Sequence, residues 1–139
     1  MRSDARKRLA PDTITIPLPW DRPPLSQNDR LHHRVKALKV AAVLGEARGA
    51  ITVVNIKPIV GAEVILHYRV ADKRRRDADN LAVVLKVCQD ALVAEGVIPR
   101  DDWVCIPASG QRIHPPNGEP AALWLELTHV HHYEPGVTA

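Results

Sequence analysis

The sequence predicts an α/β fold of the α+β type, in which a single small domain packs a mixed β-sheet against two helices. Three observations support this expectation. At 139 residues, the chain has the length of one domain rather than two. Hydrophobic residues at 45% and charged residues at 25% are ordinary for a folded protein. Segments that alternate apolar and polar residues are interleaved with two segments of helical periodicity.

The first elements are expected to be an edge strand and a helix. Residues 13–18 alternate polar and apolar side chains, and Pro17 favours an edge position because it cannot donate a ladder hydrogen bond. Residues 26–29 offer several helix N-caps. Apolar residues then recur with roughly helical spacing at Leu31, Val35, Leu38, Val43 and Leu44. Cations give this helix a basic side at Arg30, Arg34, Lys36 and Lys39. The pattern over 51–56 fits either a helix end or a short strand.

A half-buried strand and a second helix are expected next. Alternation over 62–70 places Val64, Leu66, Tyr68 and Val70 on one face of the strand. Asp79 or Asn80 can cap the helix that follows. The apolar face of this helix consists of Leu81, Val84, Leu85, Cys88 and Leu92. Gly96 suits the left-handed position just past the helix end.

Two more strands are expected over 103–108 and 121–130. Turn signals at Ser109-Gly110 and over 115–118 separate them. The buried face of the last strand is expected to comprise Leu123, Leu125 and Leu127.

The expected domain covers 13–130, between a basic flexible tail at 1–12 and a C-terminal tail at 131–139. No apolar run approaches the ~20 residues of a membrane span, and no apolar segment of the export type follows the basic start. Cys88 and Cys105 lack CxxC spacing and are expected to be reduced thiols. We therefore expect a cytoplasmic protein with no membrane partner.

The stretch Lys73-Arg-Arg-Arg-Asp-Ala-Asp-Asn80 separates a run of cations from two carboxylates at the mouth of the second helix. This separation suits a polyanion held beside a divalent cation. A solvated charge run is the competing interpretation. Aromatic residues make up only 4% of the chain, which excludes a single-strand binder that stacks bases on aromatic platforms.

A magnesium site could be formed from carboxylates on both sides of this helix. Mg²⁺ takes oxygen ligands and is usually held by one or two carboxylates together with substrate phosphates. Asp77, Asp79 and one of Asp101 or Asp102 could supply that set.

A lysine is expected on the same helix face as the carboxylates. At about 100° per residue, Asp79, Lys86 and Asp90 fall within about 20° of one another. Lys86 could therefore contact a phosphate or neutralise charge at the scissile group. The structural alternative is a surface ion pair between Lys86 and Asp90.

Together these residues resemble the RusA-type Holliday-junction resolvases, which are common in phages and prophages. The resemblance covers roughly residues 13 to 130. Its motifs are Pro19-Trp20, Pro23-Pro24, Asn28, Arg74-Arg-Arg-Asp77-Ala-Asp79-Asn80-Leu81, Lys86-xxx-Asp90-Ala91-Leu92, and Gly96 followed by Asp101-Asp102.

The resemblance implies a homodimeric, Mg²⁺-dependent endonuclease, with Mn²⁺ as an alternative metal, that cuts branched DNA at four-way junctions symmetrically in recombination and repair. It assigns metal binding to Asp77, Asp79 and Asp102, with Asp101 as a further candidate, and catalysis to these aspartates and Lys86. DNA contacts are expected from Lys73, Arg74, Arg75, Arg76, Arg69, Asn80 and Asn28. Such a protein would associate with the nucleoid through DNA. One departure is that five residues separate Asn80 from Lys86, where the family more often has two.

Other interpretations remain open. A nucleic-acid-binding protein without activity would explain the arginines but not the clustered aspartates. Another metal-dependent DNA nickase or flap endonuclease would share the metal site. The histidines, including His67 and His114, lack zinc-ligand spacing and are expected to be solvated or packed.

The dimer interface is expected on an apolar face. Candidates are the last strand, over Leu123 to Leu127, or the second helix at Val83, Val87 and Val93.

Overall fold

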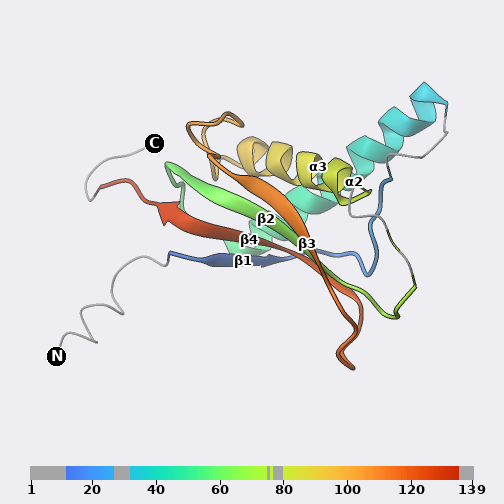
Figure 1. Ribbon diagram of the computed structural model, residues 1–139. Helices are drawn as coiled ribbons and strands as arrows, with labels where there is room; N and C mark the ends of the chain where they lie inside the picture. Colours follow the sequence, from blue (N-terminus) through green and yellow to red (C-terminus); the bar gives the residue numbers. More distant parts are fainter. Residues whose placement is uncertain (1–11, 27–31, 75, 77–79, 135–139) are drawn as a thin grey trace.

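The computed structural model describes residues 12–26, 32–74, 76 and 80–134. Within these ranges the expected fold class is confirmed: four strands form one mixed sheet, and two helices lie on one side of it (Figure 1). The elements are β1 (Ile14–Pro17), α2 (His33–Val54), β2 (Gly61–Arg69), α3 (Asn80–Ala94), β3 (Ser109–His114) and β4 (Ala122–His131).

The sheet has the strand order β1-β4-β2-β3. The inner strand β4 runs antiparallel to both of its neighbours, β1 and β2, whereas β2 and β3 are parallel. Parallel neighbours need a crossover connection, and α3 provides it. The edge position expected for the strand that contains Pro17 is confirmed.

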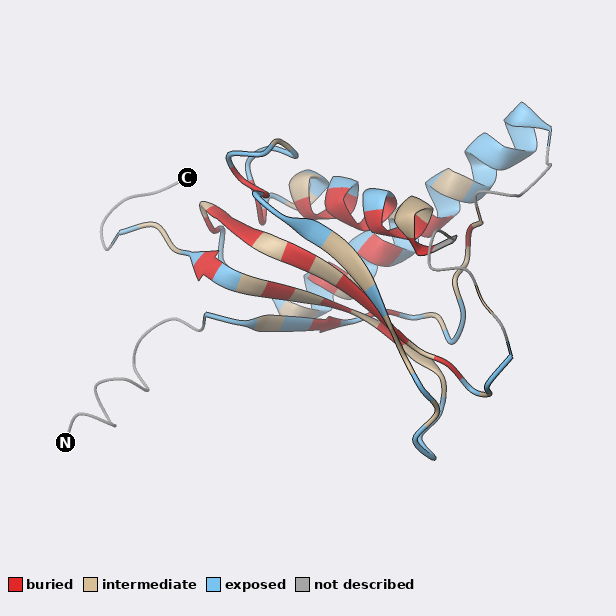
Figure 2. Cartoon of the chain, viewed as in Figure 1, coloured by how far each residue is buried: buried red, intermediate tan, exposed pale blue. Residues whose placement is uncertain are grey.

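The core lies between the sheet and the helices (Figure 2). Register pairs Leu66 with Leu125 and Val64 with Leu127, and all four side chains are fully buried. The predicted buried faces of β2, α3 and β4 are confirmed. Leu123, Leu125 and Leu127 fill the core of the single chain, so the first of the two candidate dimer interfaces is excluded. In the second candidate, on α3, Val87 is also buried in the core.

The end of α3 follows the sequence prediction. Gly96 has φ +75, and its N–H bonds to the carbonyl of Val93 at 3.0 Å. The N–H of Val97 reaches the carbonyl of Leu92 at 3.0 Å. These two bonds form a Schellman motif, which requires a residue in the left-handed conformation that glycine adopts without strain.

The start of α2 differs from the prediction. The helix begins at His33, and His32 is its N-cap, with the ring accepting the N–H of Arg34 at 3.3 Å. The expectation that a residue of 26–29 caps this helix is therefore wrong. The ambiguous segment resolves as a helix end, because the helix continues to Val54 and Asn55 is left-handed.

The apolar stripe of α2 reaches the core only in its second half. Its buried residues are Val43, Ala47 and Ile51, whereas Val35 and Leu38 are exposed. The first turns project beyond the sheet (Figure 2), and among the described residues Val35 and Leu38 are not covered by the core. Neither described helix is long and apolar enough to cross a membrane.

The third strand was misplaced by the sequence pattern. The prediction of a strand over 103–108 is wrong, because β3 covers Ser109–His114. The strand includes Ser109-Gly110, which was expected to form a turn. The N–H groups of Cys105 and Ile106 bond to the carbonyl of Asp102 at 3.2 and 2.7 Å, which closes a turn. Both side chains are buried, so the apolar pattern reflects burial in a loop.

Candidate metal and nucleic-acid site

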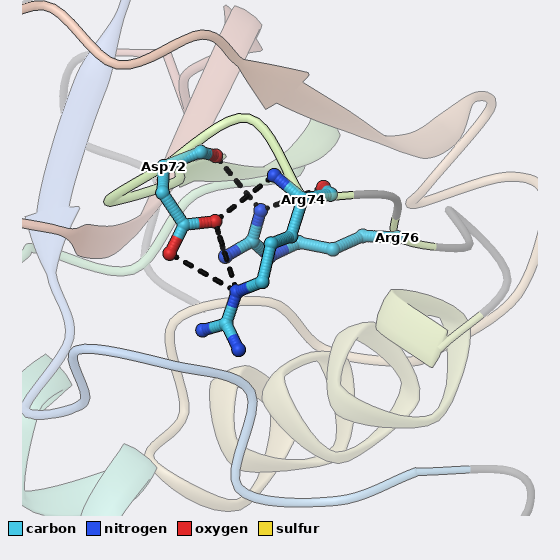
Figure 3. A network of polar contacts seen from close by, with 3 residues as sticks. All are labelled: Asp72, Arg74 and Arg76. Carbon is cyan, nitrogen blue, oxygen red and sulfur yellow. Dashed lines mark hydrogen bonds and ion pairs between the residues drawn. The ribbon is translucent and has the colours of Figure 1, made fainter.

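The loop that follows β2 is organised by Asp72 (Figure 3). Its carboxylate accepts the backbone N–H of Arg74 at 3.0 Å and the Arg74 Nε–H at 3.1 Å. Nη2 of Arg76 donates to the same carboxylate at 2.9 Å. The backbone N–H of Arg74, followed by the two guanidinium groups, lowers the pKa of Asp72 to about 2. Asp72 therefore stays ionised and holds this loop together.

The two arginines bound to Asp72 occupy different environments. Arg76 also donates to the carbonyl oxygens of Asp72 and Arg74, both at 2.9 Å, and only 22% of its side chain is exposed. The Arg74 side chain is 81% exposed. Arg76 thus braces the loop, while Arg74 projects into solvent. The sequence reasoning did not single out Asp72, although an Asp-x-Arg-x-Arg spacing just after a strand was visible.

Of the other expected DNA-binding cations, Lys73 lies within this loop and Arg69 ends β2 just before it. Lys73 is exposed. Arg69 donates to the carbonyl of Pro120 at 3.0 and 3.1 Å, and its guanidinium carbon lies 5.5 Å from the centre of the Trp124 ring. A pocket of about 230 Å³ lies between the loop and the end of β3, lined by residues that include Lys73, Arg74 and His114.

Four of the expected site residues lie outside the described residues: Asp77, Asp79, Arg75 and Asn28. Asn80 is the first residue of α3. The described part of the site therefore consists of the loop before α3, the exposed side of α3, and the loop after it.

Lys86 is held between two carboxylates on the exposed side of α3. Its Nζ lies 3.1 Å from Oδ1 of Asp90 and also contacts Oδ2 of Asp101. Gln89 Nε2 lies 3.4 Å from the other oxygen of Asp101. The pKa of Lys86 is raised, first by Asp101 and then by Asp90. The predicted common face of Lys86 and Asp90 is confirmed, as is their ion pair.

Asp101 and Asp102 point to different partners. Asp102 accepts Nε–H of Arg100 at 2.7 Å and the backbone N–H of Cys105 at 3.1 Å. Arg100 first, and then the Cys105 N–H, lower its pKa. The carboxylate of Asp102 thus stabilises its own turn, whereas that of Asp101 faces α3.

A site for a hard cation such as Mg²⁺ would need carboxylates from outside the described ranges in addition to those within them. Within the described ranges, no group of three or more His, Cys, Asp or Glu side chains could hold a metal ion. Asp90 and Asp101 supply oxygen donors but share Lys86. Asp77 and Asp79 precede α3 in the sequence and carry the donor type that Mg²⁺ prefers.

A second polar group lies on the side of the sheet opposite the helices. Nδ1 of His67 lies 2.7 Å from Nε2 of His114, and Nε2 of His67 lies 2.9 Å from Oε1 of Glu126. Both imidazole rings stack near Trp124, with ring centres 5.2 and 5.3 Å from it. The expectation of packed histidines is confirmed at these positions. The sequence did not reveal the group because its members come from three strands.

Burial lowers the pKa of His114, and the nearby His67, Arg112 and Arg69 lower it further.

No protein-family model matches the chain, and no curated protein matches it.

Proposed function

We propose that the protein is a Mg²⁺-dependent, structure-specific endodeoxyribonuclease that resolves four-way DNA junctions by paired symmetric nicks, with Mn²⁺ as an alternative metal. The observation that carries the proposal is the contact between Asp101 and Lys86. It brings a carboxylate from the loop after α3 to a lysine on the helix that directly follows Asp77 and Asp79. The exposed Arg74 lies in the loop that enters the same helix.

In this proposal Asp77, Asp79 and Asp101 hold the metal. We prefer Asp101 to Asp102 because Asp102 is engaged with Arg100 and with the Cys105 N–H. A bound Mg²⁺ would polarise a phosphoryl oxygen and lower the pKa of a bound water. Hydrolysis needs no covalent nucleophile from the protein.

The cationic side chains have separate tasks in the proposed reaction. Lys73 and Arg74 bind backbone phosphates, and Arg76 keeps their loop in shape through Asp72. Lys86 stabilises the extra negative charge at the scissile phosphate. In the free protein its ammonium neutralises Asp101 and Asp90, which limits repulsion between these carboxylates.

A homodimer follows from the geometry of the substrate. A four-way junction has approximate two-fold symmetry, and its resolution requires two cuts, whereas the sequence contains one Asp-x-Asp motif in the basic stretch. A closed two-fold dimer supplies two equivalent sites. Activity on this substrate would place the protein with the nucleoid.

Cleavage of a labelled synthetic four-way junction tests the proposal. The junction and a linear duplex of matching sequence are each incubated with protein in Mg²⁺ and in EDTA. We expect paired nicks in the junction, only with Mg²⁺, and little cutting of the duplex. Junction binding without cleavage under either condition would support a non-catalytic binding protein. A single nick per molecule would support a nickase or flap endonuclease on the same metal site.

A further inference from the structure

Trp103 is an exposed aromatic side chain. It is 81% exposed, and the neighbouring Val104 is 55% exposed. The other two tryptophans, Trp20 and Trp124, are partly covered by the domain. This exposed indole presents a flat apolar face to any partner that reaches the turn.

The turn that carries Trp103 is held in place on both sides. Asp102 accepts N–H groups from Cys105 and Ile106 at its carbonyl, and the N–H of Cys105 also reaches its carboxylate. The carbonyl of Cys105 accepts the N–H of Ala62 at 2.9 Å. A Cβ at Gly61 would overlap this carbonyl, so the close approach of turn and strand requires glycine there. The exposed ring therefore stands on a fixed support.

The turn that carries Trp103 adjoins the proposed site along the chain. Trp103 is two residues from Asp101, whose carboxylate contacts Lys86. The exposed apolar surface on this turn consists of Trp103 and Val104, which is far smaller than the roughly 1,200 Å² that a stable protein interface buries. One flat ring next to a phosphate-cutting site matches the size and shape of one nucleobase.

We propose that Trp103 stacks on a single unpaired or unstacked nucleobase next to the phosphate that is cut. Every base has a π-face, so such a contact selects an exposed base without selecting its identity. One ring is not a platform for successive bases, in agreement with the scarcity of aromatic residues. The inference rests on the proposed function, because it gives that site a preference for DNA with an accessible base.

Binding without cleavage tests the stacking contact. Three probes are compared in EDTA: a duplex with one extrahelical base, the same duplex with an abasic residue at that position, and the fully paired duplex. For Trp103→Ala we expect the dissociation constant for the first probe to rise about tenfold. Affinity for the other two probes should stay unchanged. Trp103→Phe should retain most of the preference, and Val104→Ala, on the same turn, serves as the matched control.

Fluorescence gives a second readout. The extrahelical base should quench the wild-type tryptophan emission, and Trp103→Phe should remove that quenching. Equal affinity of wild type and Trp103→Ala for the first probe would overturn the inference, even if the wild type cuts four-way junctions. Emission that changes with protein concentration in the absence of DNA would also overturn it, since the ring would then contact a second copy. A wild type that neither binds nor cuts branched DNA would overturn both this inference and the proposed function.

Discussion

The carboxylate of Asp101 contacts the ammonium of Lys86, although 15 positions separate the two residues in the sequence. The contact joins the loop after α3 to the exposed side of that helix. It distinguishes Asp101 from Asp102, whose carboxylate is bound within its own turn. This difference leads to the first prediction.

Asp101→Asn should abolish metal-dependent cleavage, because a neutral amide removes a carboxylate proposed to bind the cation. Asp102→Asn should keep most of the activity, since its amide oxygen can still accept the Cys105 N–H. Cleavage of a labelled junction, with circular dichroism to verify folding, measures both variants. The reverse result, with Asp102 essential and Asp101 dispensable, would restore the assignment implied by the family resemblance.

Arg74→Ala should weaken DNA binding through a lost phosphate contact. The slope of log binding constant against log salt concentration should become shallower by about one unit. Lys57 is an exposed cation that precedes β2, at the opposite end of the strand from Arg74, so Lys57→Ala serves as control. A slope that both substitutions leave unchanged would mean that Arg74 does not touch DNA.

Arg76→Ala should mainly affect the stability of the loop. The substitution leaves the carbonyl groups of Asp72 and Arg74, and the Asp72 carboxylate, without a donor that they have in the folded protein. We expect a lower Tm than for Arg74→Ala, measured side by side by thermal denaturation. Equal Tm values would show that the bracing contacts contribute little to folding.

The lowered pKa of His114 leads us to expect a loss of stability in mild acid. Its pKa lies below the ordinary value of 6.5 because burial disfavours the charged ring. The unfolded chain therefore binds a proton more readily than the folded one. The neutral His114 ring therefore makes its full contribution to the free energy of unfolding above the unfolded pKa. That contribution is lost as pH falls through the lower folded pKa.

Urea denaturation at pH 8 and pH 5.5 measures this effect. His114→Gln replaces the ring with a side-chain amide that offers both a hydrogen-bond donor and an acceptor but does not titrate. The midpoint should therefore fall less between the two pH values in the variant than in the wild type. Identical decreases would exclude His114 as a source of the pH dependence.

The parts of the fold that the sequence predicted are those determined by local periodicity. The buried faces of β2, α3 and β4 follow alternation or helical spacing, and Gly96 ends α3 through local backbone bonds. The pattern around Cys105 and Ile106 was misleading because burial in a turn and burial in a strand give the same apolar signal. The backbone bonds to Asp102, and a strand ladder that begins only at Ser109, identify the segment as a turn.

The sequence named the residues of the candidate site, but it predicted only part of their arrangement in space. The shared face of Lys86 and Asp90 follows from helical spacing. The choice between Asp101 and Asp102 depends on how the chain returns to α3 after Gly96, which spacing does not determine. The group formed by His67, His114 and Glu126 depends on strand register, so it became visible only in the folded chain.

The oligomeric state provides another test. Sedimentation at micromolar concentration should show a dimer, because two equivalent sites are needed for symmetric cuts. A protein that remains a monomer both alone and on junction DNA would favour a nickase that acts at one strand.

The most direct test of the central claim is cleavage of a synthetic four-way junction by the wild type and by Asp77→Asn and Asp79→Asn. Each substitution removes one negative charge from the proposed metal site and leaves the basic loop intact. We predict paired nicks by the wild type in Mg²⁺, no cleavage in EDTA, and junction binding without cleavage by both variants. Nicking by either variant at the wild-type rate in Mg²⁺ would contradict the account.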